Sequence, residues 1–173
     1  MTPRAAATHP AALWGVFGWL TLLSQAVYRL TALALEAVDH GMSGLEWGLF
    51  VFSIVFMSYS EGYKGFHLQV APRVVARAIY LARSGRLYER LLAPLFCMSL
   101  FRATRKRLII SWCLYASIIT VVILVRMLEQ PWRGIVDAGV VVGLALGTAS
   151  VLYHYVRAAS GRPLASSEVP GDD

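Results

Sequence analysis

The sequence predicts an all-α integral membrane protein, in which four transmembrane helices form a bundle and a basic cytoplasmic loop carries short interfacial helices. Of the 173 residues, 57% are hydrophobic and only 15% are charged, which is too apolar for an ordinary soluble domain. The apolar residues also form runs close to the roughly 20 residues that span a bilayer. In lipid such runs become helices, because their backbone amides must be satisfied within the segment. The four runs cover residues of about 11–35, 44–63, 108–128 and 134–157.

The basic residues predict how these helices are oriented. Ten of the sixteen Lys and Arg residues lie between residues 61 and 107, in the stretch that separates the second run from the third. Basic residues beside membrane spans collect on the cytoplasmic side. We therefore predict that this loop, the short tail 1–10 and a flexible tail 160–173 are all cytoplasmic. The preference for Arg over Lys, with abundant Ala and Gly, suggests a bacterial protein of the inner membrane.

Local signals mark the ends of the predicted membrane helices. Pro10 suits the first turn of the first helix. Ser43 can cap the second helix, and Glu46 then lies at its positively polarised end. The segment 129–134 predicts a tight outer turn between the third helix and the fourth.

The basic loop, residues 64–107, is apolar at intervals and therefore predicts helices rather than disorder. Gly62 and Gly65 indicate a sharp exit of the chain from the second membrane helix. A first amphipathic helix begins at Pro72, and a second begins at Arg86 and is interrupted at Pro94. Basic amphipathic helices of this kind lie at the level of the lipid headgroups.

Ionisable residues within the predicted membrane helices are candidate sites, because a charge in lipid is costly. Arg29 and Asp137 lie at similar depths in the first and fourth helices, which predicts an ion pair. The alternative is that the long side chain of Arg29 reaches the outer headgroups. Glu61 and His154 lie near the cytoplasmic ends of their helices and could exchange a proton. The alternative for them is a hydrogen-bonded structural pair.

A second candidate site lies where the second helix meets the basic loop. Its members are side chains that donate hydrogen bonds to phosphate, namely Lys64, His67, Arg73 and Arg77. They predict a site for the headgroup of an anionic lipid. The alternative is a simple interfacial anchor, and the spacing does not match a nucleotide phosphate loop.

The fourth helix carries small residues on one face. Gly139, Gly143 and Gly147 follow each other at intervals of four residues, and Ser150 and His154 continue the same face. Such a face allows another helix to approach closely. It predicts helix packing, either with another helix of this chain or with a second copy or another membrane protein.

Metal and cofactor chemistry is not predicted. Cys97 and Cys113 show no metal-ligand spacing, and we expect both to be buried, reduced thiols. Haem ligation would need two facing histidines, and only His154 falls within a predicted span. The net charge of +6 is explained by membrane topology, so no nucleic-acid partner is predicted.

Three functional hypotheses follow from these residues. The first is a non-enzymatic membrane component that binds partner helices and anionic lipid. The second is a small transporter or channel subunit, with a proton or solute path lined by Arg29, Asp137, Glu61 and His154. The third is an enzyme acting on membrane lipids, with Glu61 and His67 as its reactive groups.

Overall fold

The computed structural model describes residues 3–84, 86–162 and 167–169, and within these ranges the regular structure is entirely helical. Among the described helices, three are long and apolar enough to cross a membrane, and they are α2, α7 and α8. The prediction of an all-α fold is confirmed, and three of the four predicted spans correspond to helices that could cross a membrane. The elements are α1 (Pro3–Ala7), α2 (Pro10–Asp39), α3 (Gly44–Met57), the π-helix η1 (Ser58–Val70), α4 (Ala71–Ser84), α5 (Leu87–Leu91), α6 (Ala93–Cys97), α7 (Arg105–Arg126) and α8 (Trp132–Ala159).

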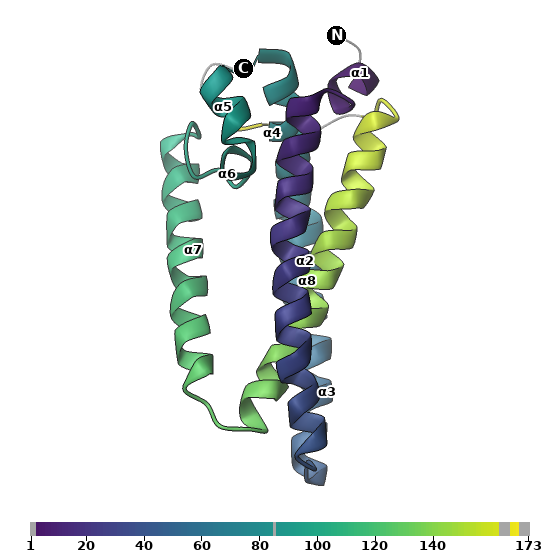
Figure 1. Ribbon diagram of the computed structural model, residues 1–173, viewed down its shortest axis with the longest axis vertical. Coiled ribbons are helices and arrows are strands. Elements are labelled where there is room, and N and C mark those ends of the chain that lie inside the picture. Colours follow the sequence, from purple (N-terminus) through teal and green to yellow (C-terminus); the bar gives the residue numbers. More distant parts are fainter. Residues whose placement is uncertain (1–2, 85, 163–166, 170–173) are drawn as a thin grey trace.

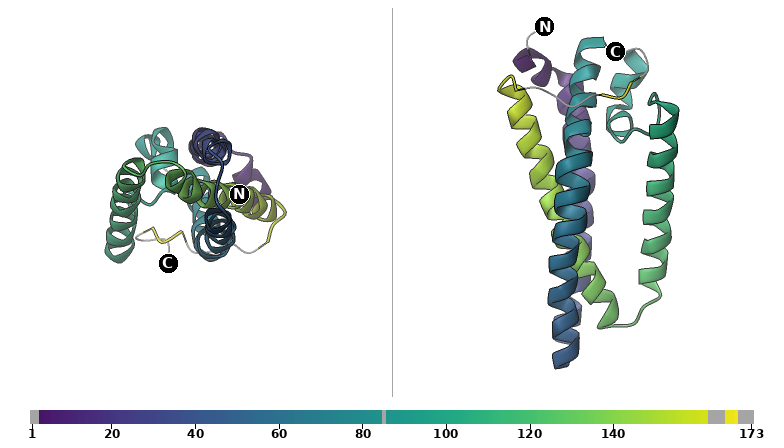
Figure 2. Two further views of the ribbon diagram at one scale, coloured as in Figure 1. Left: turned by 90° about the horizontal axis from the view of Figure 1, so that it is seen from below. Right: turned by 180° about the vertical axis from the view of Figure 1, so that it is seen from behind.

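Four helical rods of the described chain run along the long axis of the molecule (Figure 1). The chain descends in α2, returns through α3, η1 and α4, descends again in α7 and returns in α8. Seen along this axis, α8 lies between α2 and the rod that begins with α3 (Figure 2). By contrast, α7 stands apart from the other three rods, and only 6% of its apolar stretch is buried. The arrangement is therefore a three-rod bundle with an outlying helix.

The second rod is one continuous helix from Gly44 to Ser84, with the π-helix η1 in its middle. At its start Ser43 forms the expected capping box, because the Ser43 backbone N–H donates to Glu46 Oε2 at 2.7 Å. The prediction that the chain leaves the second membrane helix sharply at Gly62 is wrong, because the helix continues through this residue. Gly62 is buried against α8, and a Cβ atom there would lie 2.7 Å from Leu146 Cδ1. This glycine serves close packing between the rods and does not end the helix.

The glycine face of α8 packs against this second rod. Gly139 lies against Ser53, Gly143 against Glu61, and Gly147 against the ring of Phe66. The close approach that the spacing predicts is therefore made within the chain. An intermolecular partner would have to use a different surface.

The same face offers a matched test of close packing. A methyl group at Gly139 would clash with Ser53, whose backbone oxygen lies 2.8 Å from the added carbon. At Gly143 the nearest atoms are 3.5 Å away, which is ordinary contact. We expect Gly139→Ala to lower the free energy of unfolding in detergent by about 1–3 kcal/mol. Gly143→Ala should be neutral or stabilising, because alanine favours helix. Equal thermal unfolding of the two variants would contradict this packing.

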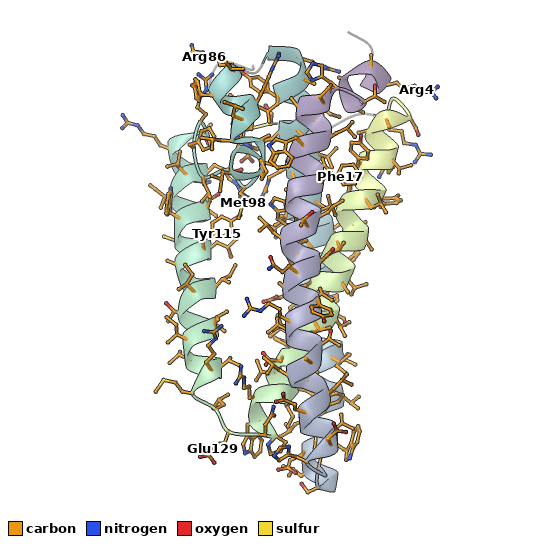
Figure 3. All side chains as sticks on the ribbon, in the orientation of Figure 1. Arg4, Phe17, Arg86, Met98, Tyr115 and Glu129 are labelled. Atoms are coloured by element: carbon orange, nitrogen blue, oxygen red, sulfur yellow. The ribbon has the colours of Figure 1, made fainter. Side chains whose placement is uncertain are left out.

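The best-buried part of the molecule lies at the end that holds both described termini. There α1, α4, α5 and α6 gather with the connector 98–104 and the segment 167–169, and we call this assembly the cap. The short helix α6 rests on α2, since Gly15 faces Cys97 and Gly18 faces Pro94. The cap thereby occupies the space beside α2 at this end of the molecule. Arg4 and Arg86 lie at the cap end, and Glu129 lies at the opposite end (Figure 3).

Candidate functional site

Arg77 of α4 is the centre of the cap. Its side chain is fully buried, and its guanidinium lies over the Phe96 ring at 4.1 Å. The group donates hydrogen bonds to backbone carbonyls from three distant segments: Nε to Phe96 at 2.7 Å, Nη1 to Ser167 at 3.0 Å, and Nη2 to Phe101 and Arg102 at 2.9 and 3.1 Å. Burial lowers the pKa of Arg77 to about 10, so the group stays charged at neutral pH. Its donors are turned inward and hold the cap together.

A second buried charge supports the neighbouring part of the cap. The side chain of Glu89 is fully buried and pairs with Arg102, whose Nε lies 2.9 Å from Glu89 Oε1. Glu89 Oε2 accepts a hydrogen bond from the Arg86 backbone N–H at 2.8 Å, and the Tyr88 hydroxyl donates to Oε1 at 3.2 Å. The carboxylate thus fixes the start of α5 and the connector to α7.

The segment Ser167–Val169 packs into the cap, although the sequence predicts a flexible tail there. Glu168 lies between Arg73 of α4 and Arg107 of α7, with nitrogen–oxygen distances of 3.4 Å to each. Val169 is buried among the cap side chains. The rest of the predicted tail beyond Arg162 lies outside the described residues. Charge pairing with two distant arginines explains why local composition alone does not predict this contact.

The four residues of the predicted lipid site do not come together. Arg77 is in the cap, and Arg73 faces Glu168. Lys64 Nζ lies over the Tyr59 ring at 4.8 Å. His67 faces α8, with its Nδ1 3.2 Å from Ser150 Oγ.

Histidines from η1 and α8 form a polar contact inside the bundle. The rings of His67 and His154 lie 5.1 Å apart, and His154 Nε2 is 3.1 Å from the His67 backbone oxygen. Tyr63 stacks on His67 from the same rod, with ring centroids 5.7 Å apart. The sequence predicts only His154 within a span, because the predicted second span ends at residue 63, whereas the helical rod continues through η1.

The predicted pairs of ionisable residues are replaced by other partners. Asp137 pairs with Arg133 one turn earlier in α8, at 3.7 Å, and Arg29 is exposed on α2. Glu61 lies against Gly143, which is eleven residues, or roughly 16 Å along the helix, from His154. The pairs Arg29–Asp137 and Glu61–His154 are therefore not formed.

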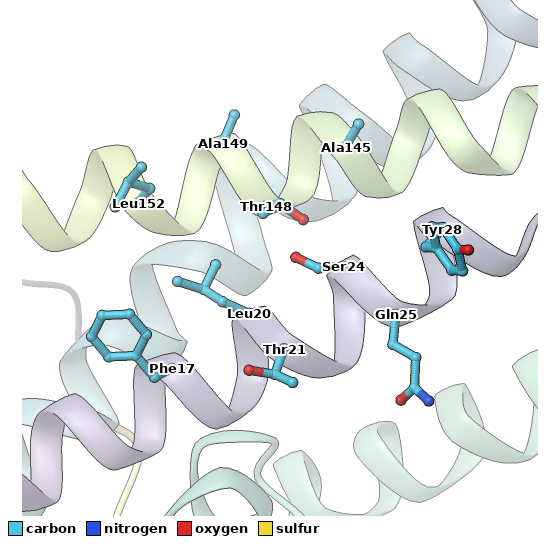
Figure 4. A pocket seen from close by; sticks show the side chains of 10 residues that line it. All are labelled: Phe17, Leu20, Thr21, Ser24, Gln25, Tyr28, Ala145, Thr148, Ala149 and Leu152. Atoms are coloured by element: carbon cyan, nitrogen blue, oxygen red, sulfur yellow. The ribbon is translucent and has the colours of Figure 1, made fainter. Parts of the chain in front are cut away.

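The outer face of α2 carries a polar row in the middle of the helix. Thr21, Gln25 and Arg29 follow each other at intervals of four residues, and all three are exposed. Part of this row borders a groove of about 920 Å³ between α2 and α8. Ser24 and Thr148 point into the space between the two helices, and Phe17 closes one end of the groove (Figure 4). The groove is mainly apolar with a few hydroxyl groups.

The helix α7 presents apolar side chains in nearly every direction. Its exposed residues include Trp112, Ile119 and Cys113, so the expectation that both cysteines are buried holds only for Cys97. Near the cap, the Tyr115 hydroxyl donates to the Met98 backbone oxygen at 3.4 Å. The remainder of α7 offers a long free surface.

Within the described ranges, no group of three or more His, Cys, Asp and Glu side chains is placed to hold a metal ion. Glu61 and His67 contact different parts of α8, Gly143 and Ser150, and so do not face a common cleft. Comparison of the chain with family models, with curated proteins and with solved structures found no match. The assignment of a function rests on geometry and physical chemistry.

Proposed function

We propose that the protein is a small, non-enzymatic, multi-pass component of a bacterial inner membrane, which assembles through its membrane helices and binds anionic lipid at the cap. In this proposal α3 and η1 together make a fourth crossing beside α2, α7 and α8. The cap and both chain ends face the cytoplasm. The position of Arg4 and Arg86 at the cap end, with Glu129 at the other end, supports this orientation.

The observation that carries the proposal is the polar row on α2. Gln25 is midway along a helix of 30 residues, roughly 45 Å long, so it lies close to the centre of the membrane. Both Gln25 and Arg29 are exposed on the surface of the bundle. Polar side chains at this depth normally face protein or water, because lipid leaves their hydrogen bonds unmade. The row therefore calls for a protein partner.

The chain itself carries a surface suited to this row. Cys113, Ser117 and Thr120 recur at helical spacing on α7, and all three are exposed. Small and hydroxyl-bearing residues let membrane helices approach closely and form hydrogen bonds between helices. We propose that α7 of one copy packs on α2 of a second copy, with Gln25 facing this hydroxyl row.

Cross-linking between two differently tagged copies tests this assembly. One copy carries Gln25→Cys with Cys113→Ser, and the other keeps Cys113; both carry Cys97→Ser. Oxidation with copper phenanthroline in native membranes should give a disulfide-linked heterodimer on a non-reducing gel. A contact within one chain cannot produce this band, because the two reactive cysteines lie on different copies.

A matched variant controls for random collision in the membrane. Leu22→Cys lies at similar depth on α2 and is also exposed, but it points about 60° away from Gln25 on the helix. We expect it to cross-link clearly less than Gln25→Cys. Absence of the heterodimer at Gln25→Cys, or equal yields at the two positions, would contradict the proposed interface.

A second candidate function is proton or solute movement along the contact between η1 and α8. Glu61 is exposed near mid-membrane beside Gly143, and the Ser150–His67–His154 contact continues toward the cap. Ionisable residues at such depth are common in proton relays. Arg29 and Asp137 are outside this contact and have no part in the path.

Flux measurements in reconstituted vesicles separate this candidate from the first. If the path exists, Glu61→Gln should abolish a proton-linked flux, because the amide cannot carry the proton. Glu129→Gln in the outer loop removes the same charge and should leave the flux unchanged. Proton flux that persists in Glu61→Gln would exclude Glu61 as a carrier.

A further inference from the structure

Beside the N-terminal end of α7, the carboxylate of Glu168 lies between two arginines that are far from it in the sequence. Glu168 Oε1 lies 3.4 Å from Arg73 Nε, and Glu168 Oε2 lies 3.4 Å from Arg107 Nε. The Glu168 backbone oxygen accepts a hydrogen bond from the Thr104 N–H at 3.2 Å. Two cations thus converge on one acidic side chain, and the backbone of the same residue contacts Thr104, which precedes the positively polarised start of the 22-residue helix α7.

The two ion pairs that Glu168 forms with Arg73 and Arg107 are long. Both of its ion-pair distances exceed the 2.7–2.9 Å that is typical of charge-assisted hydrogen bonds. Arg107 Nε is buried and has no hydrogen-bond partner among the described residues. Thr104 supplies no side-chain cap to the first turn of α7. Glu168 itself is in the left-handed backbone region, with a φ of 51°, which is strained for a residue other than glycine.

A phosphate group fits the unmet donors of this site better than a carboxylate. Its additional oxygens can accept from both guanidinium groups and from the start of α7 together. The site also lies where α7 enters its apolar stretch, which is the depth of lipid phosphates in the proposed membrane placement.

We propose that Arg73, Arg107 and the first turn of α7 bind the phosphate of an anionic membrane lipid, and that Glu168 occupies this site when the lipid is absent. This inference rests on the proposed cytoplasmic placement of the cap. Lipid and tail exclude each other, because their anionic groups need the same two arginines. The tail therefore acts as a built-in competitor that sets the affinity for lipid.

Native mass spectrometry of the full-length protein in detergent, titrated with phosphatidylglycerol, tests this competition. Glu168→Gln should tighten phosphatidylglycerol binding by about tenfold, because the competing charge is removed while side-chain size is kept. Adding Arg107→Gln to this variant should cancel the gain. Unchanged affinity in Glu168→Gln would overturn the proposal.

Two further arms separate a specific site from general charge attraction. In the Glu168→Gln background, Lys106→Gln removes one positive charge, as Arg107→Gln does, but from an exposed residue in the same turn of α7. The tighter binding of phosphatidylglycerol should persist in this variant. Loss of the gain with Lys106→Gln would overturn the site. Inorganic phosphate at the same concentration should not displace the lipid; displacement would show that the ligand is free phosphate.

Folding and assembly are read separately from lipid binding. In a Cys113→Ser background, slow alkylation of buried Cys97 reports that the cap remains closed in each variant used for the lipid titration. The heterodimer formed by Gln25→Cys and Cys113 reports the proposed assembly of copies. A failed lipid titration beside a normal cross-link would therefore reject the lipid site and leave the assembly standing.

Discussion

Replacing Arg77 with methionine is expected to open the cap and to lower its stability by about 3–5 kcal/mol. Methionine fills much of the same volume but donates no hydrogen bond. The carbonyl groups of Phe101, Arg102 and Ser167 would then lose the guanidinium as a donor, while the Phe96 oxygen would keep only its hydrogen bond from the Ser99 N–H. Each unsatisfied buried acceptor costs about 1–3 kcal/mol, and partial relaxation of the connector keeps the total below the full sum.

Alkylation of Cys97 measures this opening directly. Cys97 is buried in the cap, and its burial raises the pKa of the thiol to about 12, so a maleimide reacts with the native protein slowly. In a Cys113→Ser background, Arg77→Met should speed the reaction by about 100-fold or more, since opening is governed by local stability.

Two variants of α4 control this experiment. Arg83→Met removes an exposed arginine from the same helix and should leave the rate of alkylation unchanged. Arg77→Lys keeps the charge but not the planar arrangement of donors, so its rate of Cys97 alkylation should lie between the rates of wild type and Arg77→Met. If Arg77→Met reacts as slowly as wild type, the guanidinium does not hold the cap.

Much of the helical architecture follows from the sequence because the signals are local. The apolar runs predict α2, α7 and α8, and the Ser43–Glu46 pair predicts the start of α3. The continuation through Gly62 is not predictable in this way. A polar, glycine-containing segment resembles a helix end, and only its packing against Leu146 of α8 shows that it continues as η1.

The candidate site is harder to predict, because its partners are far apart in the sequence. Arg73 and Arg77 share one face of an amphipathic pattern, which indicates a surface directed at lipid phosphates. In the structure Arg77 is turned inward to carbonyl groups 19 to 90 residues away, and Arg73 meets Glu168. Asp137 likewise takes Arg133, its neighbour in α8, in place of Arg29. Periodicity fixes the face of a residue but not its partner.

The ion pair between Glu89 and Arg102 predicts an asymmetric response to mutation. Glu89 is fully buried, whereas the Arg102 side chain is 31% exposed. When Glu89 is replaced by glutamine, Arg102 can turn toward water, and the cost should be only about 1–2 kcal/mol. When Arg102 is replaced by methionine, the carboxylate stays buried without its cation, and the cost should reach about 3–5 kcal/mol.

The double variant distinguishes this explanation from a simple loss of packing. With Glu89→Gln present, Arg102→Met no longer strands a buried charge, so the double variant should be more stable than Arg102→Met alone. Cys97 alkylation and thermal unfolding in detergent should rank the three variants in the same order. If the two single effects simply add, the pair contributes no coupling energy. Of the two buried charges in the cap, only Arg77 would then stabilise the connector between α6 and α7.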